Sequence, residues 1–218
     1  MGAMNGEEVA AAMVARVETF CRGYESCMPA YSYVPLETDQ QRIRVLQSRL
    51  FNEVRAAEVF GTWLKTIPEL EVKMGLGEAI AEEMAHARLL AERIRERNAE
   101  PYVYLPVPGQ MAMFNAFEAL PTTIERIAAF SLAGEGVAEF MIERALVSAS
   151  VPEWIKAPYR AISRDEENHS RFPEEVIARY ATSAEAQDRV RRAVAMSLTL
   201  RRQYFSDLDD WVLRNTVW

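Results

Sequence analysis

Ten prolines divide this chain into a few long segments that contain no proline of their own. They stand at positions 29, 35, 68, 101, 106, 108, 121, 152, 158 and 173. Proline inside a helix removes a hydrogen bond, whereas at the first helical position its missing N–H costs nothing. The segments between the prolines are rich in Ala, Leu, Glu, Arg and Met, which favour helix. The spacing therefore predicts long helices, several of which begin close to a proline.

Six helices follow from this division of the chain. The predicted ranges are 6–22, 38–66, 69–98, 122–149, 153–181 and 183–214. The only strand-like alternation, at 102–105, is short and lies between prolines, which indicates an extended linker. Two helical hairpins joined by this linker predict an all-α four-helix bundle over about 38–181, with one extra helix at each end of the chain. We expect residues 1–218 to form a single domain.

The composition excludes several classes of protein. The net charge is −7, with 25 basic and 32 acidic residues and no basic block, so nucleic-acid binding is not expected. Two cysteines, Cys21 and Cys27, are too few for a disulfide framework or a four-thiolate metal site. No apolar run approaches the ~20 residues of a membrane span. The first residues lack the basic charges of a signal peptide, so a cytoplasmic protein is expected.

Both histidines of the chain occur in the same four-residue pattern. Glu83 stands three positions before His86, and Glu166 stands three positions before His169. At this spacing on a helix, a carboxylate and an imidazole project from one face and can bind the same metal ion or metal pair. The repeated Glu-x-x-His pattern therefore predicts metal ligands on the helices at 69–98 and 153–181.

A glutamate on the preceding helix accompanies each Glu-x-x-His pattern. Glu53 stands 30 positions before Glu83, and Glu135 stands 31 before Glu166, so two hairpins would bring each pair to matching depth. Glu53 interrupts an apolar helical stripe that includes Leu50 and Phe60. Because burying an unpaired charge is costly, carboxylates on such faces need a neutralising partner, which a pair of divalent metal ions would provide.

One glutamate from each of two helices, with Glu-x-x-His from each of two others, is the pattern of ferritin-like di-iron carboxylate proteins. The chain resembles that superfamily from about residue 38 to 181. The resemblance implies metal ligands at Glu53, Glu83, His86, Glu135, Glu166 and His169. It also implies that Glu82 and Asp165, which directly precede the two patterns, hydrogen-bond the histidine ligands and orient them. The residues at 53–63 and at 82–86 resemble the corresponding segments of the oxygenase-type branch, which includes bacterial tRNA hydroxylases and acyl-CoA monooxygenase subunits.

Several neighbouring residues leave alternatives open. Glu139 shares a helix face with Glu135 and could be a further ligand, a bridging carboxylate or a buried partner of an arginine. Gly134 and Gly136 could leave room for substrate or oxygen, or let two helices pack closely. Pro173 is expected either to kink the fourth long helix or to break it.

Residues on the last helix and the aromatic residues have plainer interpretations. Four arginines on the last helix are expected on a solvated face, with docking of an acidic electron donor as the alternative. These are Arg191, Arg192, Arg201 and Arg202. Five aromatic residues are expected in the core rather than in an electron relay. These are Trp63, Tyr102, Tyr104, Tyr159 and Tyr180. The two cysteines are expected to be inert rather than redox partners.

The resemblance implies a non-haem di-iron oxygenase or oxidase. Two iron ions would activate O2 as co-substrate and oxidise a small organic substrate, with manganese as an alternative in one or both sites. Because the chain lacks thiolates for an iron–sulfur centre, an external ferredoxin, a reductase or the substrate itself would supply electrons. The two terminal helices could shape the substrate site or form a homodimer. The alternative functions are a ferroxidase or peroxide-scavenging protein, and a helical scaffold with a vestigial site.

Overall fold

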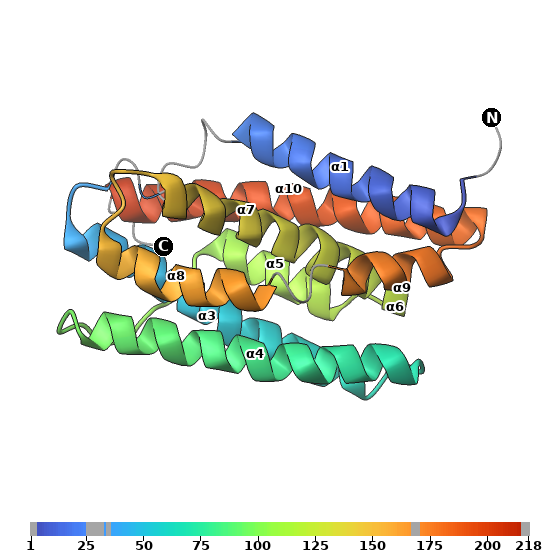
Figure 1. Ribbon diagram of the computed structural model, residues 1–218, viewed down its shortest axis with the longest axis horizontal. Coiled ribbons are helices and arrows are strands. Elements are labelled where there is room, and N and C mark those ends of the chain that lie inside the picture. The colour runs from blue at the N-terminus through green and yellow to red at the C-terminus, as the bar shows by residue number, and fades with distance from the viewer. Residues whose placement is uncertain (1–3, 25–32, 34–35, 167–170, 215–218) are drawn as a thin grey trace.

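The computed structural model describes residues 4–24, 33, 36–166 and 171–214, and within these ranges it leaves out the side chains of Tyr24, Asp165 and Glu166. All regular elements in the described residues are helices (Figure 1). They are α1 (Gly6–Tyr24), α3 (Asp39–Leu64), α4 (Leu70–Arg95), α5 (Pro108–Glu118), α6 (Thr123–Arg126), the π-helix η1 (Ile127–Leu132), α7 (Ala133–Val147), α8 (Glu153–Glu166), α9 (Phe172–Tyr180) and α10 (Ala184–Arg214). The predicted all-α helical bundle is confirmed.

The first hairpin, α3 and α4, matches the sequence prediction within a few residues. Thr38 caps the N-terminus of α3 with a capping box. Its side chain accepts a hydrogen bond from the backbone N–H of Gln41, and the Gln41 side chain accepts one from the backbone N–H of Thr38. The two helices pack against each other along one edge of the bundle (Figure 1). Their apolar faces are buried, whereas Glu58 on the opposite side of α3 is exposed. This hairpin carries three of the predicted metal ligands.

Helix α5 was not predicted. It occupies part of the connection after the non-helical stretch 102–105, which is exposed except at the half-buried Tyr104. Pro108 and Gly109 look like a turn in the sequence. Pro108 instead stands in the first turn of the helix, and the Gly109 N–H donates to Asp207 Oδ2 at 2.7 Å. A side chain at position 109 would lie 2.8 Å from the backbone nitrogen of Tyr204, so only glycine allows α5 to approach α10 this closely. The aromatic residues of α5 then fill the core.

The segment predicted as one helix at 122–149 consists of α6, η1 and α7 in succession. Each hydrogen bond of a π-helix spans one more residue than that of an α-helix, so this segment shifts the phase of the side chains that follow it. Ser197 on α10 donates to the carbonyl oxygen of Ala129 within η1 at 2.6 Å. Glu135 lies three residues after the end of η1, so its direction depends on a local irregularity that helical periodicity does not predict.

The segment predicted as one helix at 153–181 is broken into α8 and α9. Helix α8 ends at Glu166, and α9 begins at Phe172 with Pro173 in its first turn. Of the two alternatives for Pro173, the described residues therefore show a new helix start rather than a kink. Residues 167–170, between the two helices, lie outside the described part of the chain.

Helix α10 lies inside the bundle, where it packs against α1, α3, α5, α6, α7 and η1. Its buried side chains include polar ones, among them Ser197, Arg201 and Asp207. The expectation of a solvated face is therefore wrong for Arg201, which is 6% exposed, whereas Arg192 and Arg202 are exposed as expected. Helix α1 packs across α7, α9 and α10 on the side of the bundle away from α4 (Figure 1).

The aromatic residues confirm the core interpretation only in part. Trp63 is fully buried, and its ring centroid lies 5.8 Å from that of Phe60 and 5.9 Å from that of Phe130. Tyr159 is also buried, but Tyr102 is 64% exposed.

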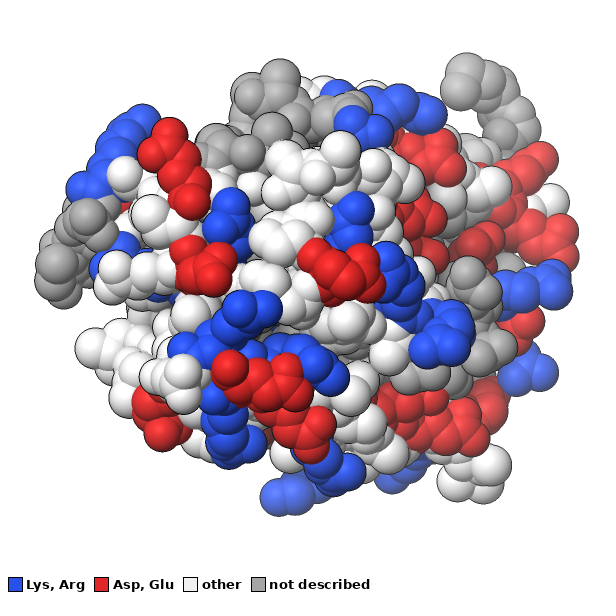
Figure 2. Space-filling model, turned by 60° about the vertical axis from the view of Figure 1, so that its left-hand side comes forward, with Lys and Arg blue, Asp and Glu red and all other residues white. Residues whose placement is uncertain are grey.

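None of the described helices is long and apolar enough to cross a bilayer. On the face drawn in Figure 2, acidic and basic side chains are interspersed.

Candidate metal centre

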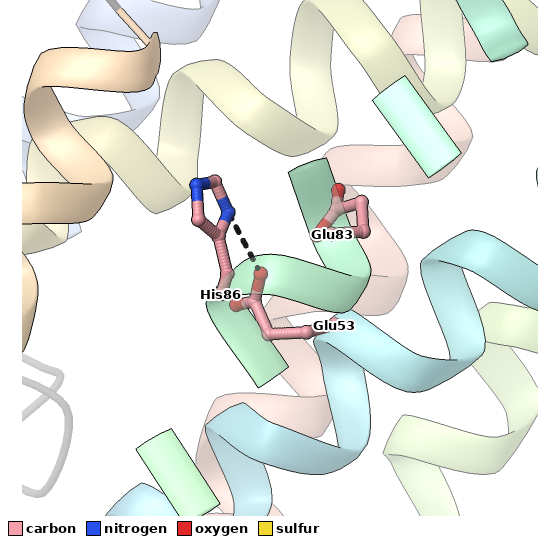
Figure 3. A group of neighbouring side chains, drawn as sticks. All are labelled: Glu53, Glu83 and His86. Carbon is pink, nitrogen blue, oxygen red and sulfur yellow. Dashed lines mark ion pairs between the residues drawn. The ribbon is translucent and has the colours of Figure 1, made fainter. Parts of the chain in front are cut away.

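Glu53, Glu83 and His86 form a compact group between α3 and α4 (Figure 3). Each offers one ligand atom, and the three atoms lie within 4.8 Å of one another. Glu53 and His86 are each 2% exposed and Glu83 is 7% exposed. The turn between the two helices therefore brings positions 53 and 83 to the same depth, as their spacing predicts.

Arg49, one helical turn before Glu53, provides the nearest positive charge. Its Nε lies 2.6 Å from Glu53 Oε1, and the arginine is itself 4% exposed. His86 Nδ1 lies 3.4 Å from the other oxygen of Glu53. Burial raises the pKa of Glu53, but the charge of Arg49 and the contacts with His86 and Glu83 outweigh it and hold that pKa at about 2. Glu53 is therefore anionic and ready to bind a cation.

Glu135 reaches the same region from α7, and Arg201 provides a positive charge close to it. It is half-buried, and together with Glu53 and Glu83 it lines a void of about 20 Å³ that Arg49 and Arg201 also line. Burial raises the pKa of Glu135 more than the charges of Arg201 and Arg49 lower it, and the nearby charge of Glu53 raises it further. The metal-free site therefore disfavours the charged form of Glu135.

The two glycines beside Glu135 serve different purposes. A Cβ atom at Gly134 would lie 2.7 Å from Arg201 Nη2, so this glycine leaves room for the arginine side chain. A Cβ atom at Gly136 would lie 3.2 Å from Val17 Cγ1, so this glycine lets α1 pack closely on α7. Close packing, one of the two expected roles, therefore applies to Gly136, whereas Gly134 accommodates a charged group that the sequence did not place here.

The raised pKa of Glu135 predicts an unusual stability change. A raised carboxyl pKa contributes stability below the unfolded pKa, and that contribution is lost as the pH rises through the folded pKa. At neutral pH Glu135 therefore costs the metal-free protein stability. We expect Glu135→Gln to raise the free energy of unfolding of the metal-free protein while weakening metal binding. Urea unfolding at pH 7 with and without Zn(II) measures both effects. A less stable metal-free variant would contradict the prediction.

The remaining predicted site residues are only partly visible. Glu82 and Glu139 are half-buried and line a larger cavity at the group. The side chains of Asp165 and Glu166 and the whole of His169 lie outside the described residues, so the second half of the ligand set stays a prediction. Arg49 and Arg201 were not among the predicted site residues.

The signals that could have identified these two arginines differ. Arg49 precedes Glu53 by four positions, a spacing that places the two side chains on one helix face. For Arg201 no comparable signal exists, because α10 meets the centre only through the tertiary fold.

A cavity of about 480 Å³ opens next to the group. Glu83, His86 and Glu135 line it at the metal-binding group, and residues of α1, α4, α7 and α9 supply its walls. Oxygen and imidazole donors are the ligands that Fe²⁺, Mn²⁺ and Zn²⁺ accept in proteins. The donor set therefore fits a divalent transition-metal ion with room for a small molecule beside it.

The sequence matches no protein-family model and no curated protein. Solved structures match the fold. A domain of unknown function with a heme oxygenase-like fold from Shewanella denitrificans aligns with a TM-score of 0.73 and 12% identity, over 93% of this chain and 93% of its own. A CADD-like protein of unknown function from Nostoc punctiforme aligns with a TM-score of 0.64 and 13% identity, over 94% of this chain and 98% of its own.

At these identities the likeness establishes the fold alone. It places the chain among helical bundles of the heme oxygenase-like and CADD-like kind. The finer placement in the oxygenase-type branch stays a prediction.

Proposed function

We propose that this protein is a non-haem di-iron oxidoreductase that uses O2 to hydroxylate or oxidise a small organic substrate. The observation that carries the proposal is the buried group of Glu53, Glu83 and His86 opening onto a cavity of about 480 Å³. Buried carboxylates and an imidazole beside a cavity with room for a small molecule form an arrangement suited to metal-dependent oxidation of an organic compound.

The chain's own residues would divide the work at this centre. Glu53, Glu83 and His86 would hold metal, with Glu135 entering from α7 and Glu166 and His169 supplying the second half of the set. Arg49 would keep Glu53 anionic and fixed in place through their contact at 2.6 Å. When bound, the metal pair would supply the reduction of O2. Manganese in one or both positions is the alternative, because carboxylate-rich donors accept either metal.

The cavity favours an organic substrate over the alternative of a ferroxidase or peroxide scavenger. Val17, Leu76 and Phe140 give its walls apolar surface for an organic body, beside the glutamates that also line it. Its volume lies within the usual range for small-molecule sites and far exceeds the space that a metal ion or a peroxide needs. With only two cysteines in the chain, we propose that electrons come from an external ferredoxin or reductase, or from the substrate.

Anaerobic iron loading followed by oxygen tests the proposal. We expect the protein to retain about two Fe(II) per chain and to show a transient visible absorption after O2 is added. Oxygen consumption should end after one turnover unless an electron donor is supplied. The Zn(II)-loaded protein is the control, because zinc does not change its oxidation state. Failure to retain iron would refute the proposal, and continued uptake far beyond two irons per chain would favour iron storage.

A further inference from the structure

Helix α4 lies along one edge of the bundle, and its outward face carries large apolar side chains (Figure 1). Leu70, Met74 and Met84 each expose between 46% and 68% of their surface. The exposed residues Gly77 and Ala81 lie between them along the helix. At the α-helical rotation these five positions fall within about 80° of one another, so they form one stripe over about four turns. We call them the α4 stripe.

The α4 stripe has the spacing of a coiled-coil seam. Its members follow one another at intervals of four, three, four and three positions. This alternation places apolar side chains where the helices of a coiled coil meet. Single exposed apolar residues are common on protein surfaces, whereas a continuous exposed stripe of them marks an interaction site. The stripe therefore fits a partner that presents a helix.

The centre of the α4 stripe is flat, because its two small residues lie one helical turn apart. Glycine destabilises the interior of a helix, so its presence there calls for a packing reason. A Cβ atom at Gly77 would meet nothing within 4 Å in this chain, whereas one at Gly75 would lie 2.5 Å from the ring of Phe172. Packing within the protomer thus accounts for Gly75 but not for Gly77. A flat surface of Gly77 and Ala81 lets the backbone of a second helix approach closely.

Charged residues on the two borders of the α4 stripe complement each other across a two-fold axis. The half-buried Lys73 borders one side and the exposed Glu78 borders the other. Neither side chain forms an ion pair or hydrogen bond with another described residue. In a parallel helix pair, opposite borders of the two seams meet, so Lys73 of each copy faces Glu78 of the other. In an antiparallel pair centred on Gly77 and Ala81, Glu78 would instead lie beside its own copy.

We propose that this protein forms a two-fold symmetric dimer in which the α4 stripes of two copies pack in parallel. Gly77 and Ala81 make the closest approach, and the methionines on either side of them pack against their copies. Two Lys73–Glu78 pairs border the contact. Because a two-fold axis uses the same surface on both copies, this single face closes the assembly.

The extent of the stripe sets the strength of the dimer. The next seam position holds the exposed Arg88, where two like charges would meet, so the contact spans 70–84. One helix face from each copy buries less surface than a standard interface, so we expect a dimer that dissociates on dilution. The contact uses α4 in place of the two terminal helices, through which the sequence allowed a homodimer.

The dimer does not depend on the proposed oxidation chemistry, although α4 serves both. Its inward face holds Glu83 and His86, so the dimer places one candidate metal centre on each side of the α4 pair. Sedimentation velocity of the full-length protein, metal-free and Zn(II)-loaded, measures the association. We expect a dimer with a Kd on the order of 10 μM. A protein that stays monomeric up to about 200 μM, well above that Kd, would overturn the proposal.

Gly77→Gln tests the close approach of the two helices. The added side chain should hold them apart and raise the dimer Kd at least about tenfold. The monomer should unfold at no lower urea concentration, because the position is open and glutamine favours helix more than glycine does. Gly61→Gln is the matched control, since a Cβ atom there also meets nothing within 4 Å but the residue lies on α3. Equal dimer Kd values for the two variants would refute the assigned face.

Charge reversal tests the parallel arrangement. Lys73→Glu and Glu78→Lys should each raise the dimer Kd about fivefold at low ionic strength, because each places like charges on both borders of the contact. The double variant exchanges the two charges and should restore the original Kd within about twofold. If each single variant weakens the dimer and the double variant does not restore it, the parallel arrangement is wrong. Unchanged Kd values in all three variants would place the dimer contact elsewhere on the molecule.

Discussion

Arg49→Met is expected to lower the free energy of unfolding of the metal-free protein by about 3 kcal/mol. Arg49 and Glu53 are both buried and lie 2.6 Å apart, so removing the arginine leaves a carboxylate without its main counter-charge. Urea unfolding at pH 7 measures the loss. Zn(II) should restore much of it in the variant, because the metal ion then neutralises Glu53 in place of the arginine.

Two controls separate the ion pair from the effect of the substitution itself. Arg55→Met removes an arginine on the same helix whose two partners, Glu58 and Glu118, are exposed, and it should cost less than about 1 kcal/mol. The double variant Arg49→Met with Glu53→Gln should recover part of the loss, since no buried charge then remains unpaired. Equal effects of Arg49→Met and Arg55→Met would contradict the assigned role.

The same pair has a pH signature with a definite sign. The pKa of Glu53 is held at about 2, below its ordinary value of 4.5. A lowered carboxyl pKa stabilises the fold above the unfolded pKa, and this contribution is lost as the pH falls toward the folded pKa. The metal-free protein should therefore lose stability between about pH 4.5 and 2 through this group, and Glu53→Gln should remove that part of the loss.

Substitution of the α4 ligands should have the largest effect on metal binding. Outer hydrogen-bond partners of metal ligands typically contribute 10- to 100-fold to affinity, so loss of a ligand should cost on the order of 100-fold or more. Glu83→Gln keeps the size of the side chain and removes its charge, which protects the test against misfolding. His86→Ala should act similarly, and competition with a chromophoric chelator measures both affinities for Zn(II).

Two further glutamates on α4 provide a weaker expected effect on Zn(II) affinity and a control without effect. Glu82→Gln, at the half-buried neighbour predicted to orient a histidine ligand, should weaken Zn(II) binding on the order of tenfold. Glu78→Gln changes an exposed residue and should leave the affinity unchanged. If all three glutamate variants bind Zn(II) as tightly as the unmodified chain does, the metal lies elsewhere.

The first hairpin was the most predictable part of the fold, because the residues that specify its helices lie close together in the chain. Prolines and a capping box set the helix ends, and the apolar stripe that Glu53 interrupts sets the face on which this glutamate lies. Two regular helices joined by a short turn then bring Glu53 to Glu83 and His86. The second hairpin was less predictable, since η1 shifts the helical phase before Glu135 and the fourth helix is broken before Phe172.

The sequence by itself determined the all-helical class, the α3–α4 hairpin and the three neighbouring donors on it, because helix periodicity and short turns act between residues close in the chain. Only the tertiary structure decided that α10 lies inside the bundle and that Arg201 enters the space left by Gly134. Only it decided that residues of α1, α4, α7 and α9 together line a cavity beside these donors. Cavities and buried counter-charges arise between elements distant in sequence, where their positions depend on packing rather than on local pattern.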